Sequence, residues 1–287
     1  MLLTQKNAKM VRKLIENFVT SSPDNRLGGP FGDEPAWGKP LVSFCRGDDP
    51  VFFFFFDAVG KDQWMPLEIF SRCFPDISVQ PGELSVISWV IPQTERTKHE
   101  QRKERKYPCL RWVRSRMFGE QFNDLVRKEV VRVLMDKGFE TVAPVLHSEW
   151  TRVDSQKYVY SSKWSERHMA YACGLGTFGL CDGLITPLGK AVRFGSVVAR
   201  ISLPRAERDN DTYYDNCPFL KKQKCGACIM RCPAGAISDK GHDKRKCKDY
   251  IRNIVAAYVK GQWDFEGYTG CGLCQVGIPC ESSIPNM

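Results

Sequence analysis

The chain has 287 residues, of which 43% are hydrophobic and 26% are charged, and its formal net charge is +9. These values are typical of a soluble globular protein with one large domain and a smaller one. No stretch approaches the length of a transmembrane helix, which excludes a membrane-spanning protein. The first residues contain neither a signal peptide nor a twin-arginine, so we expect a cytoplasmic protein with no membrane partner.

Helices and strands alternate in the first part of the chain. Residues 4–19 predict an amphipathic helix, and residues 21–50, rich in Gly and Pro, predict an irregular connection. The hydrophobic pattern then predicts buried strands at 51–59, 85–92 and 141–146, and a long helix at 118–137 that ends at Gly138. The five phenylalanines within 51–59 are expected in the core, and a substrate-lining role is the alternative.

Basic residues are concentrated in the segment 95–106, where glutamates are interspersed. This pattern is typical of a solvated loop or helix face. A patch that contacts the phosphates of a nucleic acid is the alternative interpretation.

The alternation of elements predicts a layered α/β (α+β) domain over residues 1–205. From about Pro204 the composition changes to Cys, Lys and Gly. We therefore expect a second, ferredoxin-like domain over residues 206–287.

Eight cysteines in two runs dominate that second domain. The first run contains a C-x2-C-x3-C-P core, which is typical of ferredoxins, where the Cys before Pro reaches across to the other iron–sulfur cluster. This crossing rule predicts two ligand sets, each for one 4Fe–4S cluster: Cys217, Cys225, Cys228 and Cys280 for the first, and Cys232, Cys247, Cys271 and Cys274 for the second. Two oxidised clusters would lower the net charge to about +5.

Zinc sites and disulfides are the two other uses that such cysteines can have. Paired C-x2-C motifs also suit zinc, but one zinc would leave four cysteines unused, and two zincs do not explain the Cys-Pro step. Disulfides require an oxidising compartment, for which nothing in the sequence argues. The positions of Cys217 and Cys280 depart from the usual ferredoxin spacing.

The segment 164–179 is the most informative part of the first domain. Its glycines, Gly174, Gly176 and Gly179, match GxGxxG, but a helical segment precedes them where a nucleotide-binding motif needs a strand. The glycines still permit close approach of the backbone to a large flat ligand.

With its S-E-R-x-x-A-x-x-x-G-L-G-x-x-G element, the strand 195–200 and two ferredoxin-type cysteine runs, the chain resembles the epoxyqueuosine reductases and reductive dehalogenases. The resemblance covers roughly residues 80–285 and is most specific in the last 120 of them. It implies a nitroreductase-like domain that holds cobalamin against the two-cluster domain. The implied cofactor-binding residues are Gly174, Leu175, Gly176, Thr177, Phe178 and Gly179.

The resemblance also implies a reductase in which electrons pass from an external low-potential donor through the clusters to cobalt. Epoxyqueuosine reductases carry an aspartate as proton donor six residues before the Gly-Leu-Gly, and this chain has His168 there. Histidine can donate a proton near neutral pH, so His168 is the candidate acid, with Glu166 and Tyr171 as neighbours that orient or replace it. The alternative is that His168 only packs or caps.

Two departures from the family lead to the expectation of a small-molecule substrate, with tRNA unlikely. Epoxyqueuosine reductases continue into a helical-repeat tail that helps to grip tRNA, and respiratory dehalogenases carry a twin-arginine signal; neither feature is in this sequence. Two alternatives stay open: an electron-transfer protein or cobalamin reductase that serves another corrinoid protein, and tRNA epoxyqueuosine reduction.

Five cysteines lie outside the two runs and are expected to be small buried hydrophobic residues. Two of them flank the glycine segment, so either could face the pocket. The five are Cys45, Cys73, Cys109, Cys173 and Cys181.

Overall fold

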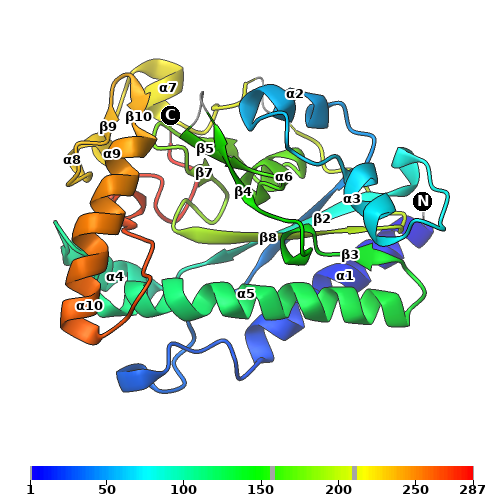
Figure 1. Cartoon of the computed structure of the whole chain (residues 1–287), viewed down its shortest axis with the longest axis horizontal. Helices are drawn as coiled ribbons and strands as arrows, with labels where there is room; N and C mark the ends of the chain where they lie inside the picture. Colours follow the sequence, from blue (N-terminus) through cyan, green and yellow to red (C-terminus); the bar gives the residue numbers. More distant parts are fainter. Residues whose placement is uncertain (1, 156–158, 209–211, 287) are drawn as a thin grey trace.

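The computed structural model describes residues 2–155, 159–208 and 212–286. It is a mixed helix-and-sheet structure built on a four-stranded antiparallel sheet with the strand order β1-β2-β8-β3 (Figure 1). The strands are β1 (Leu41–Arg46), β2 (Ser85–Pro92), β8 (Val192–Ala199) and β3 (Thr141–Val142).

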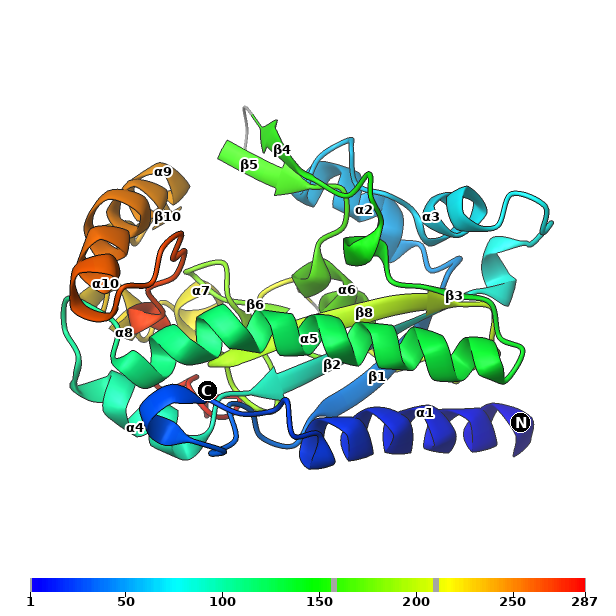
Figure 2. The same ribbon diagram turned by 60° about the horizontal axis from the view of Figure 1, so that its bottom comes forward.

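Helices cover both faces of this sheet (Figure 2). One face carries α1 (Leu2–Ser21) and α5 (Leu110–Asp136), and the other carries α2 (Val51–Ala58), α3 (Pro66–Cys73) and α6 (Glu166–Ala172). The side chains of β2 alternate between the two apolar layers, Ile87 and Trp89 toward α1 and α5, Val86 and Val90 toward α6. Burial on both faces explains why the strand is apolar throughout.

The remaining elements are short and lie mostly in the second half of the chain. They are α4 (Glu95–Lys103), β4 (Arg152–Ser155), β5 (Val159–Ser162), β6 (Thr177–Phe178), β7 (Leu184–Ile185), α7 (Pro218–Lys222), α8 (Ala227–Met230), β9 (Ile237–Ser238), β10 (Gly241–His242), α9 (Lys244–Asp249), α10 (Ala256–Trp263) and the helical turns η1 (Gly29–Phe31), η2 (Pro81–Glu83), η3 (Pro144–Leu146), η4 (Tyr250–Val255) and η5 (Leu273–Gln275).

The structure corrects four sequence predictions. Residues 21–50, predicted as an irregular connection, contain β1, an edge strand of the central sheet that pairs with β2. The phenylalanine run is the helix α2, not a strand, with Phe52 and Phe55 buried and Phe53 and Phe54 exposed, which is helical spacing. The strand predicted over 141–146 has two residues, because a prolyl turn follows it. The α/β prediction is correct only in its α+β sense, since every pair of neighbouring strands in the central sheet is antiparallel.

Other predictions are confirmed. The strand β2 has the predicted bounds. The long helix ends at Asp136, one residue before the predicted end, and starts eight residues earlier than predicted, at Leu110. Gly138 ends this helix with φ of 80°, and the N–H groups of Gly138 and Phe139 donate to the carbonyls of Met135 and Leu134. A left-handed residue with this pair of bonds is the Schellman ending.

The C-terminal part packs on the first part at α4, at α5 and at the β6–β7 hairpin. An apolar cluster includes residues of both: Leu180, Cys181 and Ile185 from the hairpin, and Cys217, Cys228, Ile237, Ile278 and Cys280 from the C-terminal part. The predicted domain boundary at residue 205 stays a prediction. In the described ranges, no helix combines the length and the apolar character needed to cross a bilayer.

Candidate functional site

The glycine segment 174–179 turns the chain from α6 into β6. Gly174 and Gly176 have φ of 69° and 155°, and a Cβ on Gly176 would lie only 2.2 Å from the carbonyl oxygen of Ile185. The absent side chain therefore lets this segment pack directly on β7. Five of the six predicted binding residues are buried, and Gly174 is partly exposed.

His168 lies in the first turn of α6, and both of its ring nitrogens are within hydrogen-bond distance of a neighbour. Nδ1 is 2.7 Å from Oγ of Ser165, and Nε2 is 2.8 Å from the hydroxyl oxygen of Tyr213. Its ring packs against Phe55 and Phe178, at centroid distances of 5.1 and 4.8 Å. Burial, with a smaller contribution from nearby cations, lowers the pKa of His168 to about 3. The imidazole is therefore neutral at pH 7.

The other two predicted catalytic residues divide between two environments. Glu166 faces away from His168: its carboxylate accepts hydrogen bonds from Arg127 at 3.0 Å and from Ser196 at 2.5 Å. Burial raises the pKa of Glu166, against the effect of Arg127. Tyr171 joins the aromatic group around His168, with its ring centroid 5.0 Å from that of Tyr213.

Tyr213 is a site residue that the sequence prediction missed. It contacts His168 through its hydroxyl group and stacks on Phe178 with ring centroids 4.4 Å apart. The backbone N–H of Phe178 also donates to the carbonyl of Tyr213 at 2.9 Å. The available signal was an adjacent pair of tyrosines, Tyr213 and Tyr214, in the otherwise polar segment before Cys217.

The cysteines predicted for the second cluster lie together. Cys271 interacts electrostatically with Cys232 and Cys247, and Cys274 interacts with Cys271. Burial raises the pKa of Cys271 to about 12. The backbone N–H of Ala236 also donates to the sulfur of Cys232 at 3.3 Å.

Three of the cysteines predicted for the first cluster also lie near one another. Cys280 interacts electrostatically with Cys217, and Cys228 interacts with Cys280. The fourth, Cys225, is exposed. The glycine inside this C-x2-C loop, Gly226, has φ of 96°, a conformation that favours glycine.

The donor chemistry of these groups suits a cubane better than a single ion. Within residues 2–155, 159–208 and 212–286, no three His, Cys, Asp or Glu side chains converge closely enough to hold one metal ion. Zinc needs four ligand atoms about 2.0–2.3 Å from one point. A 4Fe–4S cluster takes one thiolate at each of four separate iron corners, so its ligands stand further apart. Both groups contain only thiols, and thiolates are the ligands that hold iron–sulfur clusters.

Cys181 lies inside the cysteine region, although its position in the chain is far from the two runs. Its sulfur accepts a hydrogen bond from Nζ of Lys190 at 3.1 Å, and both residues are buried. Contacts with the thiols of Cys228 and Cys274, then the Lys190 ammonium, hold the pKa of Cys181 well below its ordinary value.

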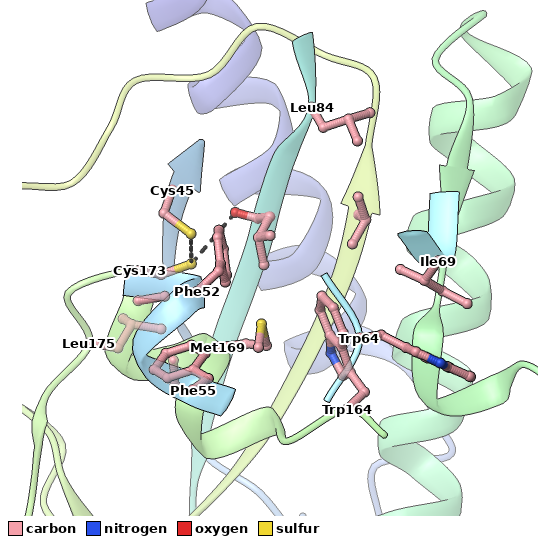
Figure 3. Packing of buried hydrophobic residues seen from close by; sticks show 14 of the residues in the cluster. Cys45, Phe52, Phe55, Trp64, Ile69, Leu84, Trp164, Met169, Cys173 and Leu175 are labelled. Atoms are coloured by element: carbon pink, nitrogen blue, oxygen red, sulfur yellow. Dashed lines mark hydrogen bonds between the residues drawn. The ribbon is translucent and has the colours of Figure 1, made fainter. Parts of the chain in front are cut away.

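The remaining cysteines follow the expectation of buried residues in most cases. Cys45, Cys109 and Cys173 are buried, and Cys73 is partly buried. Cys45 and Cys173 lie side by side in the core, with their sulfurs 3.4 Å apart (Figure 3).

No protein-family model matches the chain. It is 25% identical over 230 residues to the epoxyqueuosine reductase of Aliivibrio fischeri, a match that covers 77% of this chain and 55% of that protein. The resemblance inferred from the motifs is confirmed. The chain spans about half the length of this relative.

Two solved structures are also similar to the chain at low identity. An epoxyqueuosine reductase from Bacillus subtilis is 14% identical with a TM-score of 0.48, covering 98% of this chain and 68% of that one. A catabolic reductive dehalogenase is 14% identical with a TM-score of 0.49, covering 85% of this chain and 30% of that one.

The geometry bears on the proton donor expected from the epoxyqueuosine reductase resemblance. Only a protonated imidazole is a good acid near pH 7, and the pKa of His168 lies near 3. The hydrogen bond between His168 and Tyr213 joins a neutral base to a phenol. The catalytic role of His168 stays a prediction, and Tyr213 joins it as a candidate.

Proposed function

We propose that the protein is an iron–sulfur oxidoreductase of the epoxyqueuosine reductase and reductive dehalogenase superfamily. The observation that carries this proposal is the β6–β7 hairpin, which contacts both proposed partners of the reaction. Its first strand belongs to the aromatic group of His168, Phe178 and Tyr213, and its turn lies among the C-terminal cysteines. Electrons from clusters at these cysteines would have a short path to the aromatic group.

The proposed ligand sets are those of the crossing rule. The contacts of Cys217, Cys228 and Cys280 support one set, and those of Cys232, Cys247, Cys271 and Cys274 support the other. Cys225 completes the first set by its place in the C-x2-C-x3-C-P core.

Cobalamin is the proposed acceptor of these electrons, and when bound it would supply the low-valent metal that reduces the substrate. The segment 174–179 and β8 would line its site. Arg193 on β8 lies beside a second cation, Arg116 of α5: burial, then this neighbour, lowers the pKa of Arg193 to about 10. Its nearest carboxylate, Glu120, is 3.6 Å away and also faces Arg116. An anionic group would relieve the repulsion between these arginines.

For the substrate, the comparison favours the tRNA alternative over the small molecule that the sequence led us to expect. The curated relative is an epoxyqueuosine reductase, so we propose an epoxide of this type as the substrate. Reduction of an epoxide takes up two electrons and two protons, and His168, Tyr171 and Tyr213 are the candidate proton carriers. A small-molecule substrate is the second candidate, because a neutral histidine occupies the place of the family's acid.

Anaerobic reconstitution with iron and sulfide tests the proposal. We expect about eight iron and eight sulfide per chain, a brown protein and a rhombic electron paramagnetic resonance signal after reduction. Cys228→Ser and Cys271→Ser should each remove one cluster, and Cys73→Ser, outside both sets, should remove none. A colourless protein that binds zinc instead would contradict the proposal.

The reconstituted protein also distinguishes between the two candidate substrates. With a low-potential reductant and cobalamin, it should convert an epoxyqueuosine-containing tRNA stem loop to the queuosine form. Conversion of the free epoxyqueuosine nucleoside without conversion of the stem loop would favour the small-molecule candidate.

A further inference from the structure

Lys190 is a buried cation whose charge is directed at sulfur. It follows the β6–β7 hairpin, is 4% exposed, and donates from Nζ to the sulfur of Cys181 at 3.1 Å. Across the described ranges, no Asp or Glu carboxylate lies within 4.0 Å of its ammonium. A buried ammonium is costly unless negative charge lies beside it, so the charge partner of Lys190 must be sought among the sulfurs.

The sulfurs around Lys190 belong mainly to the proposed first cluster. After Cys181, the strongest electrostatic partners of Lys190 are Cys280, Cys274 and Cys228. Two of these three are members of the first ligand set. Cys181 itself hydrogen-bonds with Cys228 and Cys274, which places it between the two proposed sets.

The backbone fixes Lys190 in this position. Its N–H donates to the carbonyl of Cys280 at 2.9 Å and to that of Glu281 at 3.1 Å. A Cβ on Gly183 would lie 2.6 Å from Cδ of Lys190, so the glycine leaves the space through which the lysine stem runs. The chain is therefore built to hold an ammonium group against these sulfurs.

We propose that Lys190 is the internal counter-cation of the iron–sulfur cluster bound by Cys217, Cys225, Cys228 and Cys280, and that Cys181 positions its ammonium group. This inference rests on the proposed function. Reduction adds negative charge to a cluster, and a fixed cation in a medium of low dielectric constant stabilises the reduced form. Lys190 thus raises the reduction potential of one cluster relative to the other, and it is a positioning residue that ligates no iron.

Redox titration of the reconstituted protein, followed by electron paramagnetic resonance, tests the inference. Lys190→Met should leave iron content unchanged and weaken reduction of one cluster about tenfold, a shift of about 59 mV to more negative potential for a one-electron couple. Lys190→Arg keeps the charge and should stay near the wild-type potential. Lys240→Met removes an exposed lysine from the same part of the chain and should shift neither cluster.

The variant Cys181→Ala distinguishes between two roles of Cys181, which either positions the ammonium group of Lys190 or ligates iron. We expect full iron content and a shift in the same direction as in Lys190→Met but smaller. Loss of iron from Cys181→Ala would make Cys181 a ligand and overturn the assignment. Unchanged potentials in Lys190→Met, with both clusters present, would overturn the counter-cation role alone. A wild-type protein without clusters would overturn the proposed function as well.

Discussion

His168 illustrates how burial decides the chemistry of a single residue. From the sequence, a histidine at the position of an acid is a plausible donor near neutral pH. In the structure, Ser165 and Tyr213 occupy its two nitrogens and aromatic rings surround it, so the environment favours the neutral form. The sequence contains the residue type but not the solvent exposure, and the exposure sets the protonation state.

This environment predicts a pH-dependent stability. The pKa of His168 is about 3 in the folded protein and about 6.5 in an unfolded chain. Between these values only the unfolded state binds the proton, so the free energy of unfolding decreases as the pH falls. From pH 6.5 to 5.5 this residue alone should lower it by about 1 kcal/mol. Urea unfolding at both pH values measures the effect.

His168→Gln is the matched variant for that experiment, because an amide can still hydrogen-bond to Ser165 and Tyr213 but does not titrate. Wild type should lose about 1 kcal/mol more than His168→Gln between the two pH values. Equal losses in the two proteins would mean that His168 is accessible to protons in the folded state.

At the scale of elements, the helix α4 differs from its sequence prediction in an instructive way. The segment was expected to be a solvated face, and a helix is present, but Lys98 and Gln101 on it are buried. Gln101 donates to the carbonyl of Cys271 at 2.9 Å, and Lys98 donates to Ser282 at 2.7 Å. The mixed charges of the segment did not reveal the buried face of the helix. The residues that Lys98 and Gln101 contact lie more than 160 positions away in the sequence, so no local pattern indicates them.

The ion pair between Arg102 and Glu281 connects α4 to the C-terminal end of the described chain. Nε of Arg102 lies 2.9 Å from both oxygens of Glu281, whose side chain is 7% exposed, whereas that of Arg102 is 38% exposed. Arg102→Met leaves the buried carboxylate without its cation. We expect a loss of about 2 kcal/mol in the free energy of unfolding, below the 3–5 kcal/mol of a fully buried pair. Chemical denaturation measures it.

Two further variants locate the cause of that loss. Glu281→Gln in the Arg102→Met background removes the unpaired charge and should recover part of the stability. Arg72→Met breaks an exposed pair with Glu68 and Glu149, and should cost less stability than Arg102→Met. If Arg102→Met lowers the free energy of unfolding no more than Arg72→Met does, the Arg102–Glu281 pair contributes no more than an exposed ion pair.

At the scale of the whole molecule, the sequence predicted local features better than long-range ones. The strand β2 and the ending at Gly138 follow from periodicity and backbone preference, which act over a few residues. The helical state of α2 was missed because a run of phenylalanines is apolar at every spacing. Cys181 was not associated with the cluster cysteines, because contact between residues 181 and 274 depends on how the hairpin packs and leaves no local pattern.

Because this packing involves the cluster cysteines, removal of iron should destabilise the hairpin and the C-terminal part first. Cysteines make up half of the buried residues in the apolar cluster at the β6–β7 hairpin, and they bury little apolar surface, so cluster binding should contribute much of the stability there. Chelation of iron under anaerobic reducing conditions should therefore lower the melting temperature. In hydrogen exchange, protection should fall over residues 217–280 and in the hairpin 177–191, while β1, β2 and β8 stay protected.

The central sheet is enclosed by helices on both faces and needs no iron. Equal loss of protection in the sheet would mean that the two parts unfold as one unit, and the hairpin would then be a rigid link between them.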